Sequence, residues 1–303
     1  MAKGPVPPFW EQEWRRTDFS KSSVPFSEIF SGGVPKDGIP ALDGVNFTKG
    51  AAFPEAEPVI TMALEGQAER AYPVRYLMWH EIANDVIGGV PVAVTYCPLC
   101  NSALVFDRRA AGRVLSFGVS GKLRHSDMVM YDRETESWWQ QFDGEAIVGE
   151  LTGTRLKPLV NWMEPLGAFL ARNPGGPVMA EPVRGGRDYG RNPYGGYDSS
   201  ARPFLYRGEE PPHGIAPLAR VVRVGNRAWP LERLRTTPEI VEAGVRLVWA
   251  GEMASALDTG RIADGRKVAA VRVFDAATGR DVVHEVVFAF AFHAFAPDGI
   301  WML

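Results

Sequence analysis

The sequence has few cysteines and histidines, no long apolar run, and no strong excess of charge of either sign. Two cysteines and five histidines occur among 303 residues, which is too few for a disulfide framework. No apolar run reaches the length of about 18 residues that a transmembrane helix needs. The net charge is −3, which argues against a nucleic-acid partner bound through bulk positive charge.

The N-terminal segment contains prolines and Trp10 where a secretory signal would have an apolar core. We therefore expect a cytoplasmic protein, with export left open because a cleaved leader would leave no trace in a mature chain. Hydrophobic residues make up 46% of the chain and charged residues 23%, which is typical of a soluble globular protein. The length suits two domains or one large domain.

Composition divides the chain into four regions. Residues 1–58 are rich in Pro, Gly and Ser without an apolar period, which indicates a wrapping segment. Between 59 and 173, apolar β-branched runs predict strands, and apolar spacing predicts a helix over 74–85. Residues 174–217 contain nine Gly and eight Pro, which is typical of a connecting loop. Residues 218–303 form the last region.

The last region repeats parts of the second. The segment GQAERAYPVRYL (66–77) is matched by GNRAWPLERL (225–234), and MVMYDRETE (128–136) is matched by VRVFDAATG (271–279). Because these matches keep their order, they indicate an internal duplication. We therefore expect an α+β fold of mostly antiparallel strands with a few helices, built from two related halves. Only the first half has the cysteine pair, so its chemistry is expected there.

The two cysteines form the motif Cys97-Pro-Leu-Cys100 after a predicted buried strand. Two thiolates at this spacing can bind one soft metal ion. His80, on the predicted preceding helix, is the best further ligand, and His125 is the next. Two alternatives stay open. The pair can serve a thiol-disulfide or nucleophilic-cysteine enzyme, or it can be buried and purely structural.

Acidic residues near the motif are candidates for proton transfer. The segment WHEIAND (79–85) is not a metalloprotease motif, because Asn84 replaces the second histidine. Glu81 in this segment and Asp132 farther along are the candidate acid–base groups, and Cys97 is the candidate catalytic thiolate. The alternative for WHEIAND is a helix whose polar side chains hydrogen-bond to loops.

Aromatic residues and arginines supply candidate substrate contacts. Neighbouring Trp138 and Trp139 on a strand face opposite ways, so we expect one in the core and one at a pocket or interface. In the loop 184–197, Arg184, Arg187 and Arg191 can hold a carboxylate or phosphate while tyrosines stack on the substrate. The alternative is an ordered coil. The candidate substrate-binding residues are Trp139, Arg187, Tyr194 and Tyr197.

Several long segments resemble one family of bacterial and archaeal proteins, the domain of unknown function 3179. The segments that carry the resemblance, spanning about residues 58–300, are AYPVRYLMWHEIAND, VAVTYCPLCNSALVFDR, FGVSGKLRHSDMVMYDRETESWWQQFDGEAIVGEL, DYGRNPYGGY and FAFHAFAPDG. The resemblance implies that His80, Cys97 and Cys100 belong to a recurrent pattern, and it implies no particular reaction. His125 stands where the family pattern favours a small polar residue, which weakens it as a ligand. The family's members are often exported.

Together these features predict a metal-dependent enzyme, an oxidoreductase acting on a small molecule. One transition-metal ion (copper, zinc or iron) would be held by Cys97, Cys100 and His80, with one position open. The second hypothesis is a metal-binding or metal-delivery protein without turnover, and the third is the thiol enzyme. We expect no nucleic-acid or membrane partner, and a homo-oligomer is left open.

Overall fold

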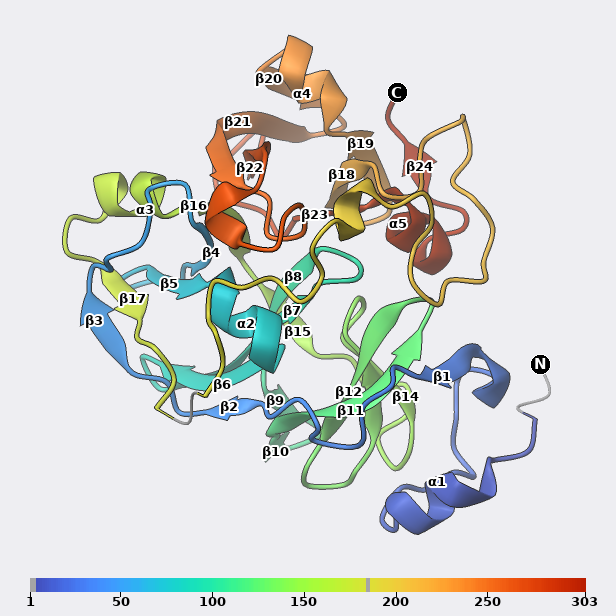
Figure 1. Ribbon diagram of the computed structural model, residues 1–303. Coiled ribbons are helices and arrows are strands. Elements are labelled where there is room, and N and C mark those ends of the chain that lie inside the picture. Colours follow the sequence, from blue (N-terminus) through green and yellow to red (C-terminus); the bar gives the residue numbers. More distant parts are fainter. Residues whose placement is uncertain (1–3, 184–185) are drawn as a thin grey trace.

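Short antiparallel strands make up most of the regular structure in the computed structural model, which describes residues 4–183 and 186–303. Within these residues the strands form a five-bladed β-propeller, and 14% of the chain is helical (Figure 1). The expected α+β fold with two related halves is therefore wrong. The strands pair in small separate sheets, and each sheet serves as one blade.

We name each blade by one of its inner strands. The β4 blade contains β3 (Phe47–Lys49), β4 (Pro58–Met62), β5 (Arg70–Pro73), β16 (Asn161–Pro165) and β17 (Pro177–Met179). The β7 blade contains β2 (Leu42–Asp43), β6 (Ile82–Ile87), β7 (Val90–Cys97), β8 (Ser102–Asp107) and β15 (Lys157–Leu159). The β12 blade contains β1 (Ile29–Ser31), β11 (Phe117–Arg124), β12 (Asp127–Asp132), β13 (Trp138–Gln140) and β14 (Glu145–Val148).

The remaining two blades lie in the C-terminal part of the chain. The β18 blade contains β18 (Arg220–Val224), β19 (Arg227–Pro230), β23 (Glu285–Phe288) and β24 (Ile300–Trp301). The β21 blade contains β20 (Glu239–Glu242), β21 (Val245–Ala254) and β22 (Lys267–Asp275). A small separate hairpin is formed by β9 (Arg109–Ala110) and β10 (Arg113–Val114).

Short helices follow strands or lie in connections. The α-helices are α1 (Pro8–Glu13), α2 (Val74–His80), α3 (Leu166–Arg172), α4 (Glu232–Thr236) and α5 (Ala289–Phe295). The 3-10 helices are η1 (Phe26–Glu28), η2 (Tyr197–Ser199) and η3 (Ile262–Asp264). Across the described residues, no helix has the length and apolarity to traverse a bilayer.

The first pair of repeated segments corresponds to one strand–helix unit that occurs in two blades, and the second pair covers β12 and β22 with the turns that follow them. The first match covers β5 followed by α2, and its counterpart covers β19 followed by α4. In both blades this strand pairs with the inner strand that names the blade, β4 or β18. The similarity is therefore between blades, and it does not divide the chain into two halves.

The helix expected over 74–85 ends at His80. Glu81 caps it with φ of 59°, and Ile82–Ile87 forms β6, which pairs with β7. His80 and Asn84 therefore lie on different elements and not on one helix face. The ladder of β6 with β7 and its burial outweigh the helical spacing of the apolar residues.

The N-terminal segment crosses three blades. Its strands β1, β2 and β3 add edges to the β12, β7 and β4 blades, and α1 packs Trp10 against Trp138 with ring centroids 4.9 Å apart. Trp138 and Trp139 are both fully buried, in two different apolar clusters. The expectation that one of them lines a pocket or interface is therefore not met, because the N-terminal segment covers the indole of Trp138.

Candidate functional site

The cysteine pair lies beside a buried carboxylate. Cys97 ends β7, Cys100 follows in the turn to β8, and Asp127 begins β12 of the neighbouring blade. Both sulfurs and one oxygen of Asp127 lie within 4.8 Å of one another, and all three residues are buried. The fold therefore joins a thiol pair to a carboxylate that sequence analysis did not select. We call these three residues the thiol–carboxylate cluster.

The turn that carries Cys100 is held by a distant blade. The backbone N–H of Phe288, at the end of β23, donates to the carbonyl of Cys100 at 3.0 Å. The Nδ2 of Asn101 donates to the carbonyl of Val286 at 2.7 Å. Asn101 has φ of 53°, a left-handed conformation that asparagine tolerates well. The position of Cys100 thus depends on the C-terminal part of the chain.

One oxygen of Asp127 is bonded and the other is not. Oδ2 accepts from Nε2 of Gln140 at 2.7 Å and from the backbone N–H of Phe142 at 3.0 Å. Oδ1 is buried and, apart from the weakly donating thiols of Cys97 and Cys100, has no hydrogen-bond partner in the described part of the chain. Burial raises the pKa of Asp127 to about 7. A buried acceptor without a partner calls for a ligand or a functional role.

A second carboxyl group, that of Glu81, lies between the cluster and open space. Glu81 as a whole is 8% exposed. Its side chain has no hydrogen bond to any described residue. Burial, with a smaller contribution from Asp127, raises the pKa of Glu81 to about 8. The positive φ of 59° at a glutamate is strained. Strain of this kind and a shifted acid together are typical of functional sites.

The two thiols are also held in their protonated form. Burial raises the pKa of Cys97 and of Cys100, and the Asp127 charge adds to both shifts. Within the described ranges, no lysine or arginine forms an ion pair with any of these four acidic groups. The site is thus a cluster of acids without a counter-charge.

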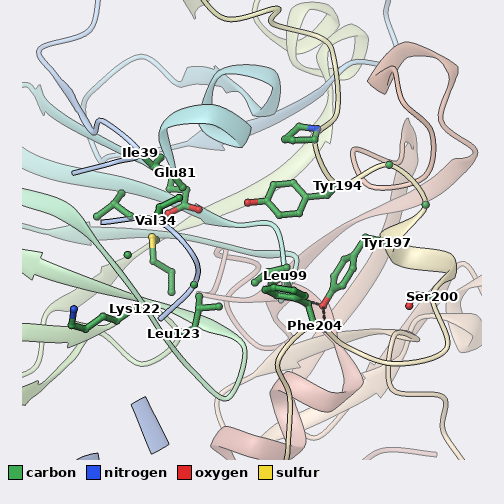
Figure 2. A pocket seen from close by; sticks show the side chains of 17 residues that line it. Val34, Ile39, Glu81, Leu99, Lys122, Leu123, Tyr194, Tyr197, Ser200 and Phe204 are labelled. Carbon is green, nitrogen blue, oxygen red and sulfur yellow. Dashed lines mark hydrogen bonds between the residues drawn. The ribbon is translucent and has the colours of Figure 1, made fainter. Parts of the chain in front are cut away.

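A cavity of about 510 Å³ is lined by Glu81 and by Leu99 and Met128, which are neighbours of cluster residues in the chain, while the three cluster residues themselves lie behind its wall. Figure 2 shows Glu81 and Tyr194 facing each other across it, with the Tyr194 hydroxyl directed toward the Glu81 carboxyl. Most of the wall is apolar or aromatic. Its lining includes Val34, Ile39, Leu99, Val119, Leu123, Met128, Pro193, Tyr197 and Phe204. This combination of an apolar wall and a few convergent polar groups is typical of a small-molecule site.

The two tyrosines of the wall differ in how their hydroxyls are used. The Tyr197 hydroxyl donates to the Leu99 carbonyl at 3.0 Å and accepts from the Phe204 N–H at 3.3 Å. The Tyr194 hydroxyl has no partner among residues 4–183 and 186–303. Burial raises the pKa of both phenols, so both are neutral at physiological pH. Tyr194 therefore offers a free hydrogen-bonding group to a ligand.

The comparison with protein families identifies a family whose model matches the chain. The family described as a protein of unknown function, DUF3179, matches residues 36–299, which is nearly the whole chain. The chain belongs to the DUF3179 family. The resemblance read from the long segments is thereby confirmed. No curated protein and no solved structure matches the chain, so the family name brings no reaction with it.

The two histidines proposed as ligands in this DUF3179 protein lie outside the thiol–carboxylate cluster. His80 contacts the Pro40 carbonyl through Nδ1 and the Tyr189 hydroxyl through Nε2, each at 2.7 Å. It lines a separate cavity of about 490 Å³. Both of its nitrogens are therefore occupied, and the carboxylate of Asp127 stands where an imidazole was expected.

His125 lies at the surface of the β12 blade. Its Nε2 is 3.5 Å from the Glu28 carboxylate, and its ring packs edge-on against Phe295. Burial of the ring, followed by the charge of Arg124, lowers the pKa of His125 to about 4. The imidazole is neutral at physiological pH and could in principle bind a metal, but it is not part of the group formed by Cys97, Cys100 and Asp127.

Two further candidates, Asp132 and Trp139, have structural partners. Asp132 accepts from the backbone N–H of Thr135 at 2.6 Å and from the indole N–H of Trp139 at 2.8 Å. This network closes the turn after β12 in the DUF3179 fold and does not reach the cavity. Trp139 is fully buried. Neither residue therefore has access to a substrate in this cavity.

The two described arginines of the loop, Arg187 and Arg191, do not line the cavity. Arg187 is exposed and lies over the Trp79 ring, 5.4 Å from its centroid. Arg184 lies outside the described residues. Of the four predicted substrate-binding residues, Tyr194 and Tyr197 are the two that the fold places in the cavity wall.

Proposed function

We propose that this protein is a metal-dependent enzyme in which Cys97, Cys100 and Asp127 hold one transition-metal ion. The observation that carries the proposal is the thiol–carboxylate cluster itself, whose ligand atoms lie within 4.8 Å of one another. Ligand atoms around one tetrahedral ion are about 3.3–4 Å apart, a separation that small side-chain rotations reach. A bound cation would also offset the free-energy cost of ionising these buried acids.

Three protein ligands leave one coordination position for water or a substrate, as in catalytic metal sites. Two thiolates favour zinc, copper or iron over magnesium or calcium. Glu81, between the cluster and the cavity, is placed to exchange protons with a molecule bound there. With iron or copper the reaction would be an oxidation or reduction of a small molecule, and with zinc it would be acid–base chemistry.

The experiment is metal reconstitution of the purified, reduced protein with zinc, iron or copper ions, followed by dialysis and elemental analysis. We expect about one ion per chain for the wild type. Cys97→Ser, Cys100→Ser and Asp127→Asn should each lower the affinity by about 10–100-fold or more. His125→Asn is the matched control, because it changes a proposed ligand outside the cluster and should retain the metal.

Far-UV circular dichroism checks that each variant is folded. If the wild type and all four variants hold equally little metal, the proposal fails, and if His125→Asn loses as much as the cysteine variants, the ligand set is wrong. Rapid alkylation of Cys97 at neutral pH in the metal-free protein would instead favour the thiol enzyme. The raised thiol pKa values argue against that result.

A further inference from the structure

The cavity presents no positive charge to a ligand. Among the described residues that line it, Lys122 is the only basic one. Its ammonium group lies 3.2 Å from the Glu13 carboxylate. It also lies over the rings of Trp14 and Trp138, at 5.1 and 5.2 Å from their centroids. Figure 2 shows this end of the side chain directed away from Glu81 and Tyr194. Only the apolar stem of Lys122 therefore faces the cavity.

With or without a metal, the site offers no cationic side chain to a bound anion. Without a metal, the nearby ionisable groups are the acids Glu81, Cys97, Cys100 and Asp127. A divalent ion held by two thiolates and one carboxylate would leave this centre with a formal charge of about −1. A carboxylate or phosphate in the cavity would find no cationic partner in the metal-free protein, and it would be repelled by the net negative charge of a metal-loaded centre.

Two polar groups in the wall lack partners. The Glu81 carboxyl is more than nine-tenths buried, directed into the cavity and without a hydrogen bond to the described residues. The Tyr194 hydroxyl, on the opposite side, is also free (Figure 2). Buried polar groups without partners are costly and select ligands that satisfy them. The remaining wall offers apolar contacts and backbone of four glycines.

We infer that this cavity binds a largely apolar small molecule, uncharged or positively charged, through a single hydroxyl or amino group placed between Glu81 and Tyr194. The same cavity excludes carboxylates and phosphates. This inference deepens the proposed function by naming its substrate class, and it rests on that function for the statement that the bound molecule is a substrate. The cavity volume of about 510 Å³ lies within the range of pockets for drug-sized ligands.

The test uses three probes with one apolar body, namely naphthylmethanol, naphthylmethylamine and naphthoate. Binding is measured by calorimetry and by ligand-observed NMR at neutral pH, on metal-free and on metal-loaded protein. We expect the alcohol and the amine to bind and naphthoate to bind at least tenfold more weakly. Glu81→Gln should reduce the preference for the amine over naphthoate at least fivefold, and Tyr194→Phe should weaken the alcohol severalfold.

Thr236→Ala is the control variant, because Thr236 is exposed, lies outside the cavity wall, and its hydroxyl donates to the Arg233 carbonyl. It should leave all three affinities unchanged. The inference is overturned if naphthoate binds as tightly as the amine, or if no probe binds at millimolar concentration. Metal content is measured separately. A protein that takes up no metal but ranks the probes as expected would sink the proposed function alone, and reversed ranking on a metal-loaded protein would sink this inference alone.

Discussion

Glu81 carries two energetic costs in one residue. Its left-handed backbone, with φ of 59°, costs about 1–3 kcal/mol in a residue other than glycine. Its carboxyl is buried beside Asp127, whose charge disfavours ionisation. Glycine would avoid both costs at this position. Backbone strain and a buried carboxyl that a glycine would remove are expected at functional sites. This agrees with the position of Glu81 in the cavity wall.

The raised pKa of Glu81 predicts how stability depends on pH. The folded pKa is about 8 and the ordinary value is 4.5, so the folded state binds more protons than the unfolded state between these values. The free energy of unfolding should therefore fall as pH rises from about 5 to 8. The loss is about 1.4 kcal/mol per pH unit at most for one such group. We expect Glu81→Gln to flatten this slope in the metal-free protein, as measured by urea unfolding.

The control for this prediction is Glu28→Gln, because Glu28 pairs with Arg124 at the surface and lies outside the acid cluster. Its slope should match that of the wild type. A Glu81→Gln protein that loses stability with pH as steeply as the wild type would show that the carboxyl of Glu81 ionises normally in the fold.

At the residue scale, sequence found part of the site. Cys97 and Cys100 are recognisable because they are three apart in one turn, and Glu81 was named as an acid. Asp127 was missed because it approaches the cysteines only through the packing of one blade against the next, so no spacing in the chain reveals it. His80 is predicted as a ligand because its helix precedes the strand that ends at the cysteines, but its ring contacts the Pro40 carbonyl instead.

At the scale of elements, α1 fastens the N-terminal segment to the β12 blade. Trp14 is 1% exposed, and its ring lies edge-on to those of Tyr131 and Trp138 at 5.0 and 5.3 Å. Trp14→Ala should lower the free energy of unfolding by about 3–5 kcal/mol, as measured by urea unfolding. Phe9→Ala, at a position that is 60% exposed, should change it by about 0.5 kcal/mol or less. Equal effects would mean that α1 is not part of the packed core.

The segment that carries Tyr194 and Tyr197 is anchored by a buried charge. Oδ2 of Asp198 accepts from Nη2 of Arg220 at 2.9 Å and from Oγ of Ser255 at 2.5 Å. Asp198→Ala would leave the guanidinium of Arg220 buried without its partner, which should cost about 3–5 kcal/mol. It should also loosen the cavity wall, so probe binding should weaken at temperatures where the variant is still folded.

Asp188→Ala is the matched control for the anchor, since Asp188 is an exposed residue of the same segment. Stability and probe binding should both stay close to the wild-type values. If Asp198→Ala unfolds at the same urea concentration as the wild type, the buried ion pair contributes nothing to the anchoring of this segment.

Strands were easier to foresee than their partners. Alternation and β-branched runs marked the regions of β7, β8 and β12, because local sequence decides whether a segment can be extended and buried. Helical spacing through Ile82 was misleading, since the same residues can be buried in a strand. These residues form a strand because β7 pairs with β6 along its whole length through backbone hydrogen bonds.

At the scale of the whole molecule, the propeller could not be read from local patterns. The repeated strand–helix unit is visible in the sequence, but its use in separate blades depends on pairings between distant segments. Residues 161–165 pair with residues 58–62, and the N-terminal strands complete three different blades. No periodic pattern specifies such long-range pairings, so similarity between blades was interpreted as similarity between halves.

The contacts between blades predict a single cooperative unit. Ser102 donates to the Glu285 carboxylate at 2.6 Å, and Arg223 donates to the Phe142 carbonyl at 3.0 Å, so the β18 blade shares polar contacts with both the β7 and the β12 blades. Calorimetry should therefore show one unfolding transition, with equal calorimetric and van't Hoff enthalpies. A chain that ends at residue 217 should lack cooperative unfolding and near-ultraviolet circular dichroism although it keeps both cysteines. Two separate transitions, or a truncated chain that folds and binds metal, would show that the region 218–303 is an independent domain and that the cysteine turn does not need β23.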